Sequence, residues 1–389
     1  MERRRRAVAR AASILALSYG LLACHAQAGA AEKPEELTVA KVPPVNPHRA
    51  FVVDVSFASM TDARVHVFDA DTSRFVGQID AGFAPGFSIS PDHKTSYVAT
   101  TYFSRGGHGT RTDVVELIDN ATLDIVGEIE IPVKHAQAVP TPYNTTLSDD
   151  GSRLYVSNIT PSTSVTVIDT SAKKVLGEID TDGCVLAYPS GNDRFTALCE
   201  SGKALTVKLD ATGKEVSRKL SDAFIDVEHD PAFVNAVRDG QRYLFTTFGG
   251  RVCSADFTGD TPVFGEPWSL VTSDERKAGW RPGGLQQTAF NAINQRLYVA
   301  MHQGSDGSHK DPATEVWVFD TVSKKRVARW KLAAQKIPPL LSIQVSADDK
   351  PLFYGLTPTS DFVVMDAATG KLRHVDKQLG TTSTLILNP

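Results

Sequence analysis

The feature that most constrains the fold is a unit that recurs along almost the whole chain. Each copy contains a short apolar strand that ends in Asp, then a polar turn, then a second strand that often contains Gly. The residues that end the first strand of the seven copies are Asp69, Asp119, Asp169, Asp210, Asp256, Asp320 and Asp366. Most copies continue with two more strands around a polar turn. Units of roughly 40 to 65 residues with this alternation are typical of propeller blades, in which neighbouring sheets cover each other's faces.

The two ends of the chain complete the ring. The seventh unit begins at Phe362 and stops after Leu387 without its last strand, whereas Arg49–Asp54 is a strand that no hairpin precedes. If Arg49–Asp54 joins the last blade, the ring closes and no exposed edge remains. The sequence therefore predicts an all-β fold over residues 49–389, a seven-bladed β-propeller of four-stranded blades. We interpret the seven Asp residues as turn formers whose carboxylates accept hydrogen bonds from nearby backbone N–H groups.

The first 30 residues are typical of an export signal peptide. Arginines at positions 3–6 are followed by an apolar segment over residues 11–23 and by small residues at 26–31, where cleavage is expected. Cys24 also fits the acylated cysteine of a lipoprotein, and the sequence leaves this alternative open. Residues 31–48 then form an N-terminal extension. We expect a periplasmic protein without a membrane span, because the apolar segment is too short to cross a bilayer.

Composition and motifs exclude several functions. The formal net charge is -4, which leaves no large basic surface for nucleic acid or acidic lipid. The sequence contains no dinucleotide or phosphate-binding glycine motif, no nucleophile elbow, and no zinc motif. His302 and His309 share a loop with Asp306 and Asp311, but their spacing fits no metal pattern. We therefore predict neither a metal site nor a catalytic residue in this chain.

Two cysteines are placed to form a disulfide. Cys184 and Cys199 flank a turn between two apolar runs, so a hairpin would bring them within bridging range. An exported protein meets an oxidising compartment, which favours the bond, although two buried thiols are the alternative. Cys253 is left over, and we interpret it as a small core residue.

Two stretches depart from the repeat, at residues 104–112 and 267–287. Insertions in repeat folds lie in loops and often on the binding face, although a solvated connection is the alternative for the first stretch.

Several stretches resemble the heavy subunit of quinoprotein amine dehydrogenases, closest to the aromatic (aralkylamine) type and also the methylamine type. The matching stretches are residues 59–69, 100–105, 110–116, 161–164, 250–256, 267–270, 280–284, 309–310 and 315–320. They extend over the whole mature domain, and Cys184 and Cys199 fall where this family has a cysteine pair.

The resemblance implies an H2L2 heterotetramer with a small light subunit. The light subunit of this family carries tryptophan tryptophylquinone, so the present chain is expected to bind no cofactor of its own. The expected reaction is the oxidative deamination of primary amines, here aralkylamines, to aldehyde and ammonia. The electrons pass to a small copper protein such as azurin or amicyanin.

The resemblance also assigns roles to residues. Phe57 matches a phenylalanine that lines the substrate channel, and the alternative is a core aromatic in the first blade. We expect a contact with the light subunit at Trp280, Arg281, Pro282, Gly283 and Gly284, because Trp and Arg are enriched in binding hot spots.

Two other functions remain as alternatives. One is a stand-alone periplasmic propeller that binds a protein or cell-wall partner and has no redox role. The other is a propeller lactonase, which would require a metal or acid–base cluster that the sequence does not show.

Overall fold

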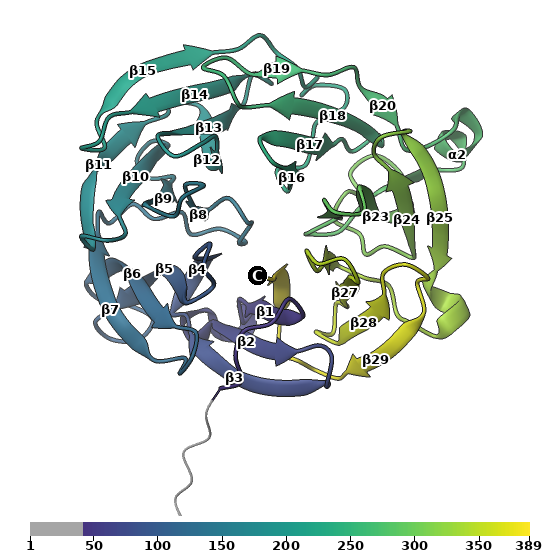
Figure 1. Ribbon diagram of the computed structural model, residues 1–389, viewed down its shortest axis with the longest axis horizontal. Helices are drawn as coiled ribbons and strands as arrows, with labels where there is room; N and C mark the ends of the chain where they lie inside the picture. The colour runs from purple at the N-terminus through teal and green to yellow at the C-terminus, as the bar shows by residue number, and fades with distance from the viewer. Residues whose placement is uncertain (1–41) are drawn as a thin grey trace, which may run out of the picture. The chain divides into compact units, whose positions relative to one another are not determined.

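Seven small antiparallel sheets form a ring in the computed structural model, which describes residues 42–389. The inner strand of each sheet lies beside a common axis, and the outer strand lies on the rim (Figure 1). The predicted all-β, seven-bladed fold is confirmed. The predicted signal peptide, Cys24 and residues 31–41 of the extension lie outside the described residues.

The blade that closes the ring combines both ends of the propeller. From the axis outward its strands are β30 (Ser383–Leu387), β1 (Arg49–Asp54), β2 (Arg64–Asp69) and β3 (Arg74–Asp80). The register pairs Phe51 with Leu387 and Val52 with Ile386. Closure through Arg49–Asp54 is therefore confirmed. The structure adds that this blade takes three strands from the N-terminal end and one from the C-terminal end.

The other six blades follow in chain order. The first of them contains, from the axis outward, β4 (Phe83–Ile89), β5 (Thr95–Phe103), β6 (Arg111–Asp119) and β7 (Ile125–Ile131). The second contains β8 (Thr145–Leu147), β9 (Arg153–Asn158), β10 (Ser164–Asp169) and β11 (Lys174–Asp180). The third contains β12 (Cys184–Pro189), β13 (Arg194–Cys199), β14 (Ala204–Leu209) and β15 (Glu215–Leu220).

The last three blades include two that carry an extra short strand. The fourth blade contains β16 (Val237–Asp239), β17 (Arg242–Thr246), β18 (Arg251–Asp256) and β19 (Val263–Phe264), and its extra strand is β20 (Trp268–Ser269). The fifth contains β21 (Trp280–Pro282), β23 (Arg296–Gln303), β24 (Glu315–Asp320) and β25 (Lys325–Lys331), and its extra strand is β22 (Thr288–Asn291). The sixth contains β26 (Ser342–Val345), β27 (Leu352–Leu356), β28 (Phe362–Asp366) and β29 (Leu372–Asp376). In residues 42–389 the helical segments are η2 (Phe57–Asp62), α2 (Ser273–Lys277) and η3 (Leu332–Gln335).

The core lies between the blades rather than inside one of them. Phe51 and Val53 of β1 pack toward the β4–β7 blade in a cluster with Phe87. The alternate residue of β1, Val52, packs in the opposite direction, in a cluster with Tyr354 of the β26–β29 blade. Because successive side chains of a strand point to opposite faces, a strand between two blades must be apolar on both. Burying each large apolar side chain contributes about 1.5–3 kcal/mol, so blade contacts are the main source of stability.

The unit that recurs in the sequence is displaced from the blade by two strands. A unit that starts with β2 and β3 supplies the outer half of the closing blade, and it continues with β4 and β5 in the inner half of the next blade. Each unit therefore bridges two blades, which couples the stability of neighbours.

The seven Asp residues form turns, as predicted. Each carboxylate accepts a hydrogen bond from a backbone N–H two to four residues further along the chain; the donors are Asp71 and Thr72 for Asp69, Ala121 for Asp119, Ser171 and Ala172 for Asp169, Thr212 and Lys214 for Asp210, Thr258 for Asp256, Ser323 for Asp320, and Thr369 for Asp366. All seven turns join the third and fourth strands of a blade, so they lie at the same end of the ring. We call this end the short-turn face.

The opposite end of the ring carries the longer connections, and we call it the long-loop face. It includes the loops at residues 55–63, 104–110, 132–144, 221–236, 270–279 and 304–314. Both stretches that depart from the repeat contribute to this face. Residues 104–110 are exposed, in agreement with a solvated connection.

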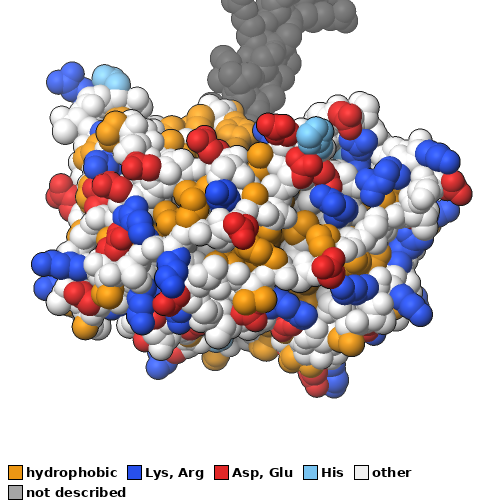
Figure 2. Space-filling view, turned by 90° about the horizontal axis from the view of Figure 1, so that it is seen from above, with side chains coloured by type: hydrophobic (Ala, Val, Ile, Leu, Met, Phe, Trp, Pro, Cys, Tyr) orange, Lys and Arg blue, Asp and Glu red, His pale blue; other side chains and the backbone are white. Residues whose placement is uncertain are grey.

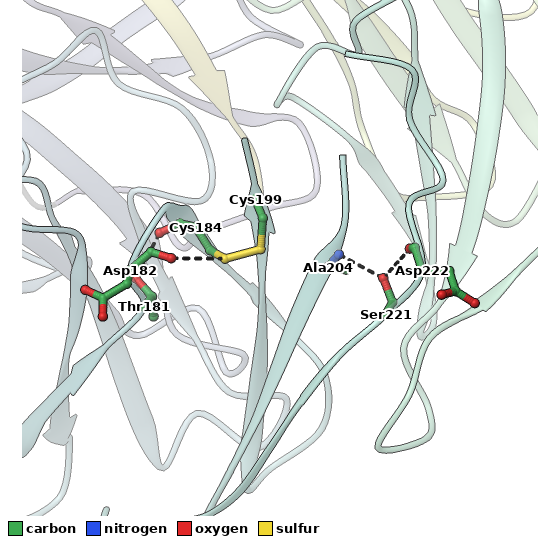
Figure 3. The surroundings of a disulfide bond; sticks show 7 residues. All are labelled: Thr181, Asp182, Cys184, Cys199, Ala204, Ser221 and Asp222. Carbon is green, nitrogen blue, oxygen red and sulfur yellow. Dashed lines mark hydrogen bonds between the residues drawn. A yellow bond between two sulfur atoms is a disulfide. The ribbon is translucent and has the colours of Figure 1, made fainter. Parts of the chain in front are cut away.

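Cys184 and Cys199 form the predicted disulfide on the long-loop face. The two residues are direct partners in the pairing of β12 with β13, and their sulfur atoms are 2.03 Å apart (Figure 3). Closing a loop of this size stabilises the fold by about 3 kcal/mol in the chain-entropy model. Cys253 is a buried free thiol in the core, as predicted.

The surface does not carry a field of one sign on the side that Figure 2 shows, where Lys and Arg alternate with Asp and Glu. This agrees with the formal net charge of -4. Within residues 42–389, no helix combines the length and the hydrophobicity that a membrane crossing requires.

Candidate functional site

Phe57 lies on the surface of the long-loop face, in the loop between β1 and β2. It begins the short helix η2, and its side chain is 49% exposed. Met60 in the same helix is 39% exposed. The alternative in which Phe57 is a core aromatic is therefore wrong. The loop turns outward at Ser56, whose φ of 48° places it in the left-handed region.

Phe57 forms one wall of an apolar cavity of about 230 Å³. The lining residues come from three segments: Val55, Phe57 and Met60 from the β1–β2 loop, Ala84 from β4, and Gln137, Ala138 and Val139 from the β7–β8 loop. Gln137 is the one polar residue among them, and no charged side chain lines the cavity. The arrangement can hold an apolar group, but it has no acid, base or nucleophile of its own.

A buried carboxylate holds the Phe57 wall in place. Asp54 ends β1 and accepts hydrogen bonds from the backbone N–H groups of Ser56 at 2.9 Å and of Thr381 and Thr382 at 2.7 Å each. Burial alone would raise the pKa of Asp54, but the ring of His66, whose Nε2 lies 3.6 Å from the carboxylate, and the hydrogen bonds from these amides outweigh it and lower the pKa. The charged carboxylate therefore ties the β1–β2 loop to the segment that precedes β30.

A second buried carboxylate holds the opposite wall. Asp113 lies in β6 and accepts from Thr101 Oγ1 at 2.7 Å, from Arg111 Nε at 2.7 Å and Nη2 at 2.6 Å, and from the backbone N–H of His135 at 2.9 Å. Arg111 also donates to the carbonyl of His135 at 3.1 Å. The amide of Gln137 donates to Thr101 Oγ1 at 3.2 Å. The wall that contains Gln137 is thus tied to Asp113 at two points.

His135 is a neutral histidine beneath this wall. Burial, with a further contribution from Arg111, lowers the pKa of His135 to about 4, although Asp113 acts in the opposite direction. Neither ring nitrogen has a hydrogen-bond partner among the described residues. A buried neutral imidazole of this kind makes the stability of the wall depend on pH.

Further exposed apolar side chains lie on the same half of the long-loop face as the cavity. Beyond the cavity they are Tyr102, Val133, Ile159, Val185 and Val227. These residues lie in or beside the connections of the three blades built from β4 to β15. We call them, together with Phe57, Met60 and Val139, the apolar arc. On the rest of this face, from β16 to β29, no large apolar side chain of the described residues is exposed to the same degree. Clustered exposed apolar residues mark interaction sites more often than scattered ones do.

The five predicted interface residues lie in another blade and do not join the cavity. Pro282, Gly283 and Gly284 are buried in the packing of the chain itself. A Cβ added at Gly283 would lie 2.4 Å from the ring of His302, which explains the need for glycine there. Only Trp280 and Arg281 keep some exposed surface. The light-subunit contact at these five residues stays a prediction, and it rests on Trp280 and Arg281.

His302 lies in β23 and His309 in the 304–314 loop, so the two do not share a loop as expected, and each has a structural partner. His302 Nε2 lies 3.0 Å from Ser308 Oγ, and the ring of His309 stacks on Phe248 at 4.1 Å between centroids. Within residues 42–389 no group of three or more His, Cys, Asp or Glu side chains is arranged to hold a metal ion.

A larger cavity, of about 690 Å³, opens on the short-turn face between the last two blades. Its charged residues are of both signs, Arg296, Lys350 and Arg373 with Asp349 and Asp366. Arg296 is already paired with Asp320. Because this lining combines charges of both signs and Arg296 is already paired, the smaller apolar cavity at Phe57 is the better candidate.

The sequence alone indicated only one residue of the cavity. Gln137, Ala138 and Val139 belong to no motif, and Asp113 lies in a matched stretch without an assigned role. The signal that was available is the charged pair Arg111 and Asp113 at the start of an otherwise apolar strand.

Comparison with known families places the whole propeller in one of them. The sequence profile of the methylamine dehydrogenase heavy chain family (MADH) matches residues 46–388. The methylamine dehydrogenase heavy chain of Methylorubrum extorquens is 30% identical over 388 residues, which are 98% of this chain and 92% of that protein. The corresponding chain of Paracoccus versutus is 31% identical over 368 residues, 92% of this chain and 83% of that protein.

Solved structures of low identity share the fold alone. A putative 6-phosphogluconolactonase from Bacteroides fragilis has a TM-score of 0.59 at 12% identity and covers 89% of this chain and 99% of its own. A dihydro-haem d1 dehydrogenase has a TM-score of 0.55 at 15% identity and covers 90% of this chain and 77% of its own. These similarities support the propeller and carry no argument about activity.

Proposed function

The chain belongs to the methylamine dehydrogenase heavy chain family, and from this premise we propose that it is the heavy subunit of a periplasmic quinoprotein amine dehydrogenase. In this role it is the scaffold for a light subunit and one wall of the substrate channel. The observation that carries the proposal is the family match over residues 46–388, which includes all seven blades and both faces. The export signal expected at residues 1–30 supports the periplasmic location.

The partner that we propose is the light subunit, in an H2L2 heterotetramer. The apolar arc supports this proposal, because it is an exposed apolar surface on the same face as the Phe57 cavity. Interfaces that are permanent have apolar centres, and burying each large apolar side chain contributes about 1.5–3 kcal/mol.

We assign the tryptophan tryptophylquinone to the light subunit, because the tryptophans of this chain do not fit such a group. Trp280 and Trp317 are neighbours, with ring centroids 5.2 Å apart. Trp317 is fully buried, and its ring is covered by the guanidinium groups of Arg326 and Arg329. The contribution of the present chain is therefore to bind and orient the side chain of the amine.

The substrates that we propose are primary amines with an aromatic side chain, which are converted to aldehyde and ammonia. An apolar cavity of about 150 Å³ is sufficient for benzene. The cavity of about 230 Å³ at Phe57 can therefore hold one aromatic ring, whereas methylamine would leave most of it empty. Because no carboxylate lines the cavity, the ammonium end of the amine must point out of it, toward the partner subunit.

The proposed electron acceptor is a small copper protein similar to azurin or amicyanin. This part of the proposal rests on the resemblance alone. It is tested by mixing the reduced complex with either copper protein and following the bleaching of its blue colour.

The decisive experiment for the proposed function is co-expression of this chain with the light subunit, followed by purification. We expect the two chains to co-elute, to absorb visible light as a quinone does, and to reduce an artificial dye when 2-phenylethylamine is added. A colourless monomer isolated from cells that grow on amines would contradict the proposal and favour a stand-alone periplasmic propeller.

A further inference from the structure

The two walls of the Phe57 cavity are loops, and each is held by its own buried carboxylate. The β1–β2 loop carries Phe57 and Met60, and the β7–β8 loop carries Gln137 and Val139. Neither Asp54 nor Asp113 lines the cavity. The inference drawn from this arrangement rests on the proposed function, because it concerns which amine the cavity selects.

Asp54 connects the first wall to a distant part of the chain. Its partners Thr381 and Thr382 lie 327 and 328 positions away in the sequence. Its third partner, Ser56, directly precedes Phe57. The position of Phe57 is thus tied to the closure of the ring.

Asp113 connects the second wall to the neighbouring blade. It is fully buried and receives four hydrogen bonds, two of them from the guanidinium of Arg111. The backbone of His135 and, through Thr101, the amide of Gln137 are both held by this carboxylate. Hydrogen bonds to a charged group contribute more than neutral ones.

We propose that Asp54 and Asp113 are positioning residues that set the width of the cavity and thereby the selectivity for amines with an aromatic side chain. The physical reason is the short range of apolar contacts. A gap of about 0.5–1 Å between a wall and the ring already forfeits a quarter to a half of the dispersion attraction. A small amine makes few of these contacts, so a displaced wall affects it little.

The long-loop face also offers a matched control. Asp230 accepts hydrogen bonds from Thr247 Oγ1 at 2.8 Å, from the N–H of Gly249 at 2.6 Å and from Arg251 Nε at 3.0 Å. It therefore anchors a loop on the same face with a similar set of partners. It does so away from the cavity.

The experiment compares Asp54→Asn, Asp113→Asn and Asp230→Asn in the complex with the light subunit. The measurement is the ratio of kcat/KM for 2-phenylethylamine to kcat/KM for methylamine. We expect this ratio to fall by about tenfold in the first two variants, through a higher KM for the aromatic amine, which corresponds to the loss of one charge-assisted contact. In Asp230→Asn the ratio should stay within about twofold of the wild type.

Hydrogen exchange on the isolated chain provides a second readout that does not need activity. We expect faster exchange at residues 133–139 in Asp113→Asn and at residues 55–62 in Asp54→Asn, each by about tenfold over Asp230→Asn. If Asp113→Asn does not fold, Thr101→Val removes the hydroxyl that joins Gln137 to Asp113 and keeps the size of the side chain. A smaller increase in hydrogen exchange and a smaller fall in the amine ratio are then expected.

The outcomes separate this inference from the proposed function. A wild-type complex that oxidises no amine contradicts the proposed function, while the exchange data still decide whether the carboxylates hold the walls. Equal exchange in all three variants, or loosened walls with an unchanged amine ratio, would overturn the positioning role even in an active enzyme.

Discussion

The two faces of the ring connect their strands in different ways. On the short-turn face, seven Asp residues each satisfy the backbone of their own turn within four residues. On the long-loop face, Asp54 and Asp113 hold loops through partners that are up to 328 positions away. The short-turn face is therefore locally determined, whereas the long-loop face depends on the assembled ring.

This difference indicates which face carries function. A turn that satisfies its own hydrogen bonds can recur without change, and a substitution there affects stability alone. The long-loop face instead holds the Phe57 cavity and the apolar arc, which remain exposed in the isolated chain. Binding residues are often found on loops that a rigid scaffold positions.

The largest effect is expected when two phenylalanines with the same exposure are each replaced and compared. Phe57 on the long-loop face and Phe75 on the outer strand β3 are both 49% exposed. Phe57→Ala should lower kcat/KM for 2-phenylethylamine relative to methylamine by about 10–200-fold, the usual range for lost apolar contact in a pocket. Phe75→Ala should leave this ratio unchanged. Both should change the free energy of unfolding by less than about 0.5 kcal/mol. Equal amine ratios in the two variants would remove Phe57 from the channel.

A smaller effect is expected when the pH is lowered. It tests whether the buried His135 makes the long-loop face the one that is sensitive to acid. The pKa of His135 is about 4 in the folded chain and 6.5 in its ordinary state, so the unfolded chain binds the extra proton between these values. The contribution of neutral His135 to the free energy of unfolding is complete above pH 6.5 and is lost as the pH falls toward 4. At pH 5 the free energy of unfolding is lower by about 2 kcal/mol, because this pH lies roughly 1.5 units below the ordinary pKa of histidine.

The measurement for this prediction is denaturant unfolding between pH 7 and pH 4.5. His135→Gln should flatten the dependence of the unfolding free energy on pH. His93→Asn, an exposed site on the short-turn face where φ is 58°, serves as the control and should keep the wild-type slope. An unchanged slope in His135→Gln would show that this histidine does not titrate as its burial suggests.

The smallest effect is expected on the short-turn face. Asp169 accepts from the N–H groups of Ser171 and Ala172. Asp169→Ala should lower the free energy of unfolding by about 1 kcal/mol, as the loss of a capping side chain does. The amine selectivity of the complex should not change. If Asp169→Ala altered the amine ratio as strongly as Phe57→Ala, the functional distinction between the faces would be lost.

The fold was accessible from the sequence because its determinants are local and repeated. The seven Asp turns, the strand Arg49–Asp54 and its pairing with the C-terminal strand were all predicted and are all present. The displacement of the blade from the unit was not predicted, because a repeat has no natural starting point along the chain. The Cys184 and Cys199 pair was accessible for a local reason too, since the two residues are partners in one hairpin.

The site was accessible only in part. Phe57 was identified through the resemblance, but its exposure was not foreseen. Trp280 and Arg281 looked like interface residues from their type, yet the neighbouring Gly283 and Gly284 are explained by close packing against His302 and the backbone of Leu341. Residue type alone does not distinguish an exposed loop from one that packs against its own chain.

The sequence by itself determined the all-β propeller, its seven blades, its closure and its disulfide, because period-two alternation and Asp turns act over a few residues. Only the tertiary structure decided which loops face each other. Val139 and Phe57 become neighbours because the ring places the β7–β8 loop beside the β1–β2 loop, and Asp54 reaches Thr381 because the last strand returns to the first blade. Contacts of that kind depend on the closed ring, and no short pattern in the chain encodes them.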